Sequence, residues 1–118
     1  MSDAVSWVVE LTVRSEALEG FRALTQEMVE ATRAEPGALV YERFVSADGL
    51  TVHLCERYTD SDAALAHLRV FGDRFAGRFA AMVERRRVCV YGTPSADLRT
   101  ALDAIGAEYL RPLDGFAR

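Results

Sequence analysis

Apolar and polar residues alternate along four stretches of the chain, which is the pattern of half-buried β-strands. The first is the clearest: Val5, Trp7, Val9, Leu11 and Val13 share one face, with mostly polar residues between them. The four predicted strands span residues 5–13, 38–45, 50–58 and 88–92. A turn-forming cluster at residues 46–49 joins the second and third strands, so we expect these two to form a hairpin.

Between these strands, apolar residues recur every three or four positions, which predicts amphipathic helices. The first helix is expected to begin at Ser15, a favourable N-cap, and to end at the segment 35–37, which is Glu-Pro-Gly. Asp60 or Ser61 caps the second, which two glycines are expected to break into two segments. A third helix follows residues 93–95, and residues 111–118 look irregular. The three arginines at 85–87 precede the fourth strand, and we expect them in a solvated turn or at the rim of a dimer.

The order of these elements is β-α-β-β-α-β followed by one extra helix, which is the ferredoxin-like α+β plan. We therefore expect a four-stranded antiparallel sheet with helices on one face. The chain of 118 residues has the length of one domain. We predict a single domain over residues 1–118, with a core at about 5–92 and a helical extension at about 93–118.

Apolar residues fall on both faces of the predicted strands. Two helices cover only one face, and the other would be a large apolar patch if it met water. We expect a second copy of the chain to cover it, giving a homodimeric α+β barrel. The alternative is that the third helix folds back over part of that face.

Composition and charge limit the kinds of partner that the protein is expected to bind. The formal net charge of −4 argues against nucleic acid, which needs a basic face. No stretch has the length and apolarity of a membrane span, and the N-terminus has no positively charged leader. Together with the two cysteines, read as reduced thiols, this predicts a cytoplasmic protein with no membrane association. Phosphate-binding glycine loops and the G-x-S-x-G serine elbow are absent from the sequence.

Two titratable residues are candidates for chemistry. Glu56 shares a strand face with apolar residues, so its carboxylate must be paired or protonated, and such groups often lie at functional sites. A structural ion pair with an arginine is the alternative. His67 lies at the edge of the apolar stripe of the second helix, where it can shuttle a proton or simply be half exposed. His53 and Cys55 share a strand face, but the sequence offers no convincing further ligand, so we predict no metal site.

The segment 35–42, Glu-Pro-Gly-Ala-Leu-Val-Tyr-Glu, resembles the E-P-G-x-x-x-Y-E segment of the antibiotic biosynthesis monooxygenase family. Residues 54–58 and 63–68 resemble its next motif, a strand ending in Glu-x-aromatic and an Ala-rich helix that carries His. The resemblance implies a homodimeric ferredoxin-like barrel with a pocket between sheet and helices, and cofactor-independent oxygenation of an aromatic or quinol-like molecule. Glu56 and His67 match motif positions, whereas Tyr58 stands where the family often has Trp. The haem-degrading branch relies on Asn, Trp and His. Because this chain has no Asn and has Tyr58 at the Trp position, we do not expect haem degradation, and we predict no cofactor.

Our leading hypothesis is a small monooxygenase that needs no cofactor and acts on an electron-rich aromatic. In it His67 is the base or proton shuttle, and Glu56 orients His67 or a water. The aromatic residues expected to bind the substrate are Trp7, Tyr41, Tyr58, Phe71 and Phe75. The alternative is a non-enzymatic dimeric protein of the same fold, ligand-binding or stress-related, in which Glu56 and His67 are structural and side chains fill the pocket. Isomerase or cyclase chemistry would need the same acid/base pair.

Overall fold

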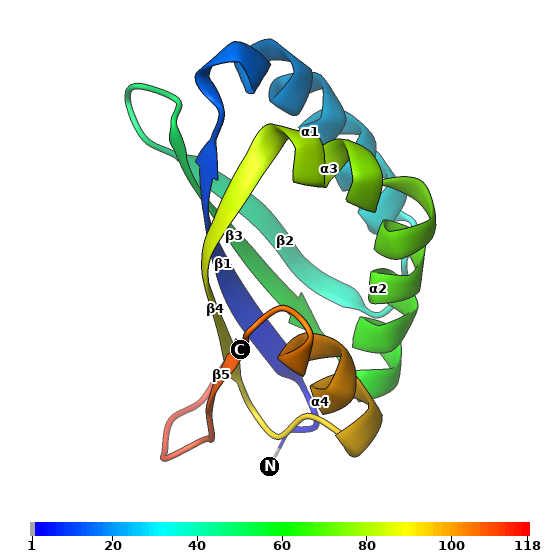
Figure 1. The fold of residues 1–118 in the computed structure, drawn as a ribbon. Coiled ribbons are helices and arrows are strands. Elements are labelled where there is room, and N and C mark those ends of the chain that lie inside the picture. Colours follow the sequence, from blue (N-terminus) through cyan, green and yellow to red (C-terminus); the bar gives the residue numbers. More distant parts are fainter. Residues whose placement is uncertain (1) are drawn as a thin grey trace.

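The structure is a computed structural model and describes residues 2–118. Its elements follow the predicted order, with a short 3₁₀ turn before the first helix and a fifth strand near the C-terminus (Figure 1). They are β1 (Val5–Val13), η1 (Ser15–Ala17), α1 (Leu18–Arg33), β2 (Ala38–Val45), β3 (Thr51–Tyr58), α2 (Ser61–Arg74), α3 (Ala76–Met82), β4 (Val83–Tyr91), α4 (Ala96–Asp103) and β5 (Glu108–Leu110).

The five strands form one sheet in the order β2-β3-β1-β4-β5. The first four are antiparallel, as predicted, and β5 adds a parallel strand at the edge of β4. The α+β ferredoxin-like fold is therefore confirmed, with one strand more than the sequence predicted. The fifth strand is only three residues long, too short to show alternation, and Gly106 makes the turn after α4 with a φ of +74°.

The helices lie on one side of the sheet, and α4 closes one end of the space between the sheet and α2 (Figure 1). The core lies in this space, because the odd-numbered residues of β1 are all buried towards the helices. Two residues of α4, Leu98 and Leu102, are also fully buried in this core. The helix α4 is therefore part of the main core and does not fold back over the opposite face of the sheet.

Two local predictions about the helices held and one was wrong. Asp60 caps α2 by accepting a hydrogen bond from the Ala63 amide at 2.8 Å. The predicted break separates α2 from α3 at Phe75. Ser15, however, makes no capping hydrogen bond to α1, because the chain enters that helix through the 3₁₀ turn η1.

The strand β4 begins five residues earlier than expected, so the three consecutive arginines at 85–87 lie within it and not in a turn. A β-bulge interrupts its pairing with β1: Glu10 faces Arg87 and the next residue, Leu11, faces Arg85. Arg86 is the extra residue, and alternation along the strand reverses there. Arg85 therefore lies on the helix-facing side of the sheet, opposite Leu11.

The opposite face of the sheet is more polar than the sequence pattern indicated. Ion pairs cross it from β3 to β5: His53 to Glu10 at 3.7 Å, Glu10 to Arg87 at 3.7 Å and Arg87 to Glu108 at 3.3 Å. Large apolar side chains also lie exposed on this face, with Phe44 more than half exposed. Because this face carries both ion pairs and exposed apolar side chains, the dimer stays a prediction.

No helix of residues 2–118 is long and apolar enough to cross a membrane.

Candidate active site

Glu56 lies at the centre of the sheet with its side chain facing the helices. Its partners across the two neighbouring strands are Trp7 on β1 and Tyr41 on β2. The residue is 7% exposed, so an unpaired carboxylate would be costly there. Tyr58, two residues along the same face, donates its hydroxyl hydrogen to Glu56 Oε1 at 2.7 Å. This short, charge-assisted bond offsets part of the cost of burial.

His67 projects from α2 towards Glu56 and is 6% exposed. Its Nδ1 lies 3.1 and 3.2 Å from the two carboxylate oxygens of Glu35, and its Nε2 lies 3.4 Å from Glu56 Oε1. A carboxylate only accepts hydrogen bonds, so Nδ1 carries a hydrogen and donates it to Glu35. The imidazole is therefore fixed between two carboxylates, with Nε2 directed at Glu56.

Glu35 reaches His67 because of the tight turn between α1 and β2. Gly37 packs so closely on the start of α2 that a Cβ there would lie 2.5 Å from the Cβ of Ala63. The Gly37 carbonyl also accepts a hydrogen bond from the Thr59 amide at 3.0 Å, which joins the turn to the end of β3. The Glu-Pro-Gly segment thus ends the helix and brings its own carboxylate to the histidine.

Aromatic rings enclose this group of charged residues. The ring of Tyr58 lies 5.0 Å from those of Trp7 and His67, and Tyr41 meets His67 edge-on at 5.4 Å. Burial, and then the negative charge of Glu56, raise the pKa of Tyr58, so its hydroxyl stays protonated and remains a donor to Glu56. Burial also raises the pKa of Tyr41, whose hydroxyl accepts a hydrogen bond from Arg43 at 3.0 Å.

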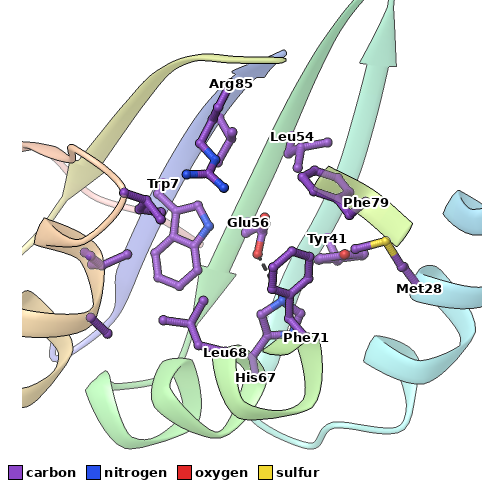
Figure 2. A pocket seen from close by; sticks show the side chains of 14 residues that line it. Trp7, Met28, Tyr41, Leu54, Glu56, His67, Leu68, Phe71, Phe79 and Arg85 are labelled. Atoms are coloured by element: carbon purple, nitrogen blue, oxygen red, sulfur yellow. Dashed lines mark ion pairs between the residues drawn. The ribbon is translucent and has the colours of Figure 1, made fainter. Parts of the chain in front are cut away.

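A pocket of about 180 Å³ opens beside Glu56 and His67, between the sheet and the helices (Figure 2). Its walls are apolar except for Glu56, His67, Arg85, the hydroxyl of Tyr41 and the indole nitrogen of Trp7. The lining residues are Trp7, Val9, Met28, Tyr41, Leu54, Glu56, His67, Leu68, Phe71, Phe79, Arg85, Ala101, Leu102 and Ile105.

One oxygen of Glu56 faces this pocket. Oε1 is occupied by Tyr58 and His67, whereas Oε2 has no hydrogen-bond partner among residues 2–118. Within that part of the chain, Arg43 Nε is the one fully buried side-chain nitrogen or oxygen without a partner. Because Oε2 also lacks a partner but is not fully buried, it is accessible from the pocket, where it can accept a hydrogen bond or a proton.

Most predicted site residues come together in this pocket. Glu56, His67, Trp7, Tyr41 and Phe71 line it. Tyr58 lies behind the wall and acts through its contacts with Glu56 and His67.

Phe75 was also expected to bind substrate, because it continues the helical stripe of Phe71. The structure leaves it out of the lining: the break between α2 and α3 falls at this residue, and its ring packs in the core beside the guanidinium groups of Arg74 and Arg78. A continuous helix would have kept the two rings on one side.

Three features of the candidate site were missed in the sequence analysis. Glu35 was read only as part of a helix stop, although the Glu-Pro-Gly motif that carries the family resemblance contains it. Arg85 was assigned to a turn, because alternation alone does not reveal a β-bulge. The wall from α4 depends on long-range packing that has no local signal.

The second histidine, His53, lies far from this pocket on the opposite face of the sheet, beside Glu10. Both cysteines are free. Residues 2–118 contain no group of three or more His, Cys, Asp or Glu side chains arranged to hold a metal ion.

The family model for antibiotic biosynthesis monooxygenase matches residues 4–70 of the chain, which span β1 to most of α2 and include Glu35, Glu56 and His67. The chain belongs to the antibiotic biosynthesis monooxygenase family. Among curated proteins it is 36% identical over 67 residues to Putative monooxygenase Rv0793 of Mycobacterium tuberculosis. That match spans 57% of this chain and 66% of the relative, slightly less than two thirds of its length.

Solved structures of the family share this fold. The structure of Rv0793 is 28% identical with a TM-score of 0.65, covering 78% of this chain and 96% of the other. SnoaB, a cofactor-independent oxygenase from Streptomyces nogalater, is 18% identical with a TM-score of 0.67, covering 80% and 97%. MupZ from Pseudomonas fluorescens is 23% identical with a TM-score of 0.89, covering 100% and 91%. The MupZ match therefore includes the C-terminal extension, which supplies one wall of the pocket here.

Proposed function

We propose that this protein is a cofactor-independent monooxygenase that oxidises a small electron-rich phenol or quinol in the pocket beside Glu56. The observation that carries the proposal is the Glu35–His67–Glu56 arrangement, in which a buried histidine is held between two carboxylates on the wall of an apolar pocket. Such an arrangement can accept a phenolic proton, which is the step that makes an aromatic ring reactive towards O₂. The name of SnoaB, a cofactor-independent oxygenase, supports the same class of reaction.

The pocket favours a small substrate. Its volume of about 180 Å³ is below the roughly 300–1,000 Å³ typical of pockets for drug-sized ligands. A cavity of about 150 Å³ holds a benzene molecule. One or two fused rings, lying between Trp7 and Phe71, therefore fit the space better than a larger polycyclic molecule.

In the proposed reaction, the substrate hydroxyl donates to Glu56 Oε2, and its proton passes to the Glu56–His67 pair. Glu35 stabilises the positive charge that His67 acquires. The electron-rich phenolate then transfers electrons to O₂. One oxygen atom is added to the ring, which is oxidised to a hydroxyquinone, and the other is reduced to water with protons from the substrate. One quinol and one O₂ thus give one hydroxyquinone and one water, and the substrate supplies all four electrons.

The direct test uses 1,4-dihydroxynaphthalene under ¹⁸O₂. The enzyme should yield 2-hydroxy-1,4-naphthoquinone with one labelled oxygen, whereas spontaneous oxidation gives the unhydroxylated quinone and hydrogen peroxide. His67→Ala should lower kcat by about 10²–10⁴-fold, the usual contribution of acid–base catalysis. A matched control is His53→Ala, which removes the other histidine. Turnover that His67→Ala leaves intact would reject the role of His67, and failure to incorporate label would reject the reaction.

The family resemblance also leads us to propose a homodimer, formed through the sheet face that carries Phe44 and Tyr91. Sedimentation at micromolar concentration tests this assembly. A stable monomer would refute it without affecting the pocket, which is complete within one chain.

A further inference from the structure

We infer that Arg85 selects substrates that carry a carboxylate, so that the physiological substrate is an anionic phenol such as a hydroxylated aromatic acid. This inference rests on the proposed function and names the substrate class of the same pocket. Arg85 is the only arginine among the described residues that line the pocket.

The β-bulge at Arg86 places Arg85 in the pocket. Without the extra residue, alternation from Val88 would turn Arg85 to the opposite face, where Arg87 lies among carboxylates. With it, Arg85 faces the helices. Bulges of this kind often re-aim a side chain beside an active site. Figure 2 shows the guanidinium of Arg85 directed into the side of the pocket where Trp7 and Glu56 lie.

The three consecutive arginines differ in their partners. Arg86 pairs with Glu84 at 2.9 Å, and Arg87 pairs with Glu10 and Glu108. Arg85 makes no ion pair or side-chain hydrogen bond with any of residues 2–118, in a chain with four more acidic than basic side chains. An arginine left without a carboxylate in an acidic protein retains its full capacity for a bidentate bond to an anion.

Arg43 is the alternative candidate on the same side of the sheet. Its guanidinium also lacks a carboxylate, but it donates to Thr25 at 2.8 Å and to Tyr41 at 3.0 Å. It is also absent from the described lining of the pocket beside Glu56. Arg43 therefore supports Tyr41 from behind, whereas Arg85 meets the ligand.

The polar groups of the pocket then have separate tasks. Glu56 Oε2 is a hydrogen-bond acceptor without a partner among residues 2–118 and suits a hydroxyl, whereas a carboxylate placed beside it would have no hydrogen to donate. Arg85 is exposed and lies where the pocket meets solvent, so it suits a charged group that keeps part of its hydration. An aromatic acid would thus enter ring first, with its hydroxyl towards Glu56 and its carboxylate at the mouth.

The test compares two ligands of nearly equal shape, 2-naphthoate and 2-naphthamide, which differ in charge and do not react with O₂. Titration calorimetry gives each Kd, and quenching of Trp7, the single tryptophan of the chain, reports binding in the pocket. The wild type should bind naphthoate roughly tenfold more tightly than naphthamide, the size of one charged hydrogen bond. This preference should weaken as salt is added.

Arg85→Ala should abolish the preference by weakening naphthoate alone, and Arg85→Lys should keep part of it. Arg86→Ala, which removes a neighbouring arginine outside the pocket, is the matched control and should keep all of it. The inference would be overturned if the wild type bound naphthoate and naphthamide equally, or if Arg86→Ala lost as much of the preference as Arg85→Ala. Neither result would affect the oxygenation assay. If neither ligand quenches Trp7, both the inference and the proposed pocket are refuted.

Discussion

Tyr58→Phe tests whether Glu56 is held as a buried carboxylate by its neighbour. The substitution keeps the ring and removes only the hydroxyl that donates to Glu56 Oε1 at 2.7 Å. Tyr58 is 0% exposed, so water does not replace the lost donor without rearrangement. A hydrogen bond to a charged group contributes about 1.5–3 kcal/mol, and we expect the free energy of unfolding at pH 7 to fall by that amount.

The pKa of the Tyr58 hydroxyl also determines how the stability lost in Tyr58→Phe depends on pH. The pKa of Tyr58 is raised in the folded protein by burial and by Glu56, whereas in the unfolded chain it stays near its ordinary value of 10.0. Above that pH the unfolded state therefore binds fewer protons than the folded state, and stability falls as pH rises. One tyrosine contributes up to about 1.4 kcal/mol per pH unit. Tyr58→Phe removes this contribution, so the stabilities of the two proteins should converge between about pH 10 and 12.

Urea unfolding followed by circular dichroism measures both effects, at one fixed protein concentration because any dimer would make stability concentration-dependent. Tyr109→Phe is the matched control: its hydroxyl bonds Asp103 near the surface, where the expected cost is smaller. Parallel loss of stability by wild type and Tyr58→Phe from pH 10 to 12 would refute the reasoning, since the phenol would then titrate alike in both states.

Three further predictions concern how the pocket is positioned. Gly37→Ala should destabilise the fold by about 1–3 kcal/mol, because its Cβ would lie 2.5 Å from that of Ala63; thermal unfolding of Gly37→Ala and of the double variant with Ala63→Gly should show recovery in the latter. Glu35→Gln should lower kcat about tenfold with little change in KM, since it removes the charge that stabilises protonated His67; an unchanged kcat would exclude that role. Leu98→Ala should cost about 2–5 kcal/mol in urea unfolding, because Leu98 is 0% exposed; a loss near zero would mean that α4 is not part of the core.

Sequence patterns predicted the fold wherever burial is periodic. The alternation of β1 appears unchanged in the structure, and the stripe of α2 places His67 beside the sheet because neighbouring turns already face the core. The pattern failed at irregularities. The bulge at Arg86 reverses the alternation along β4 and has no signal in the sequence pattern. The break of the second helix was predicted, but its position at Phe75, which takes that ring out of the stripe of Phe71, was not.

The candidate site could be predicted only in part for the same reason. Glu56 was identifiable because a carboxylate among apolar residues is unusual. Glu35 was not, since its approach to His67 depends on the packing of Gly37 against Ala63, which are far apart in the sequence. Arg85 was assigned to the wrong element. The residues that a pattern marks as exceptional were found, and those that a turn or bulge brings in were not.

The C-terminal extension connects these observations to specificity. Matches to Rv0793 and SnoaB cover 78% and 80% of this chain, whereas the match to MupZ covers all of it. The family model covers residues 4–70, which contain Glu35, Glu56 and His67, but neither Arg85 nor α4. The proposed proton-accepting group thus lies within the segment that the family model matches, and Arg85, with its proposed role in carboxylate binding, and the wall formed by Ala101, Leu102 and Ile105 lie outside it. In this chain the proposed acid–base group and the residues proposed to choose the substrate therefore lie in different parts of the fold.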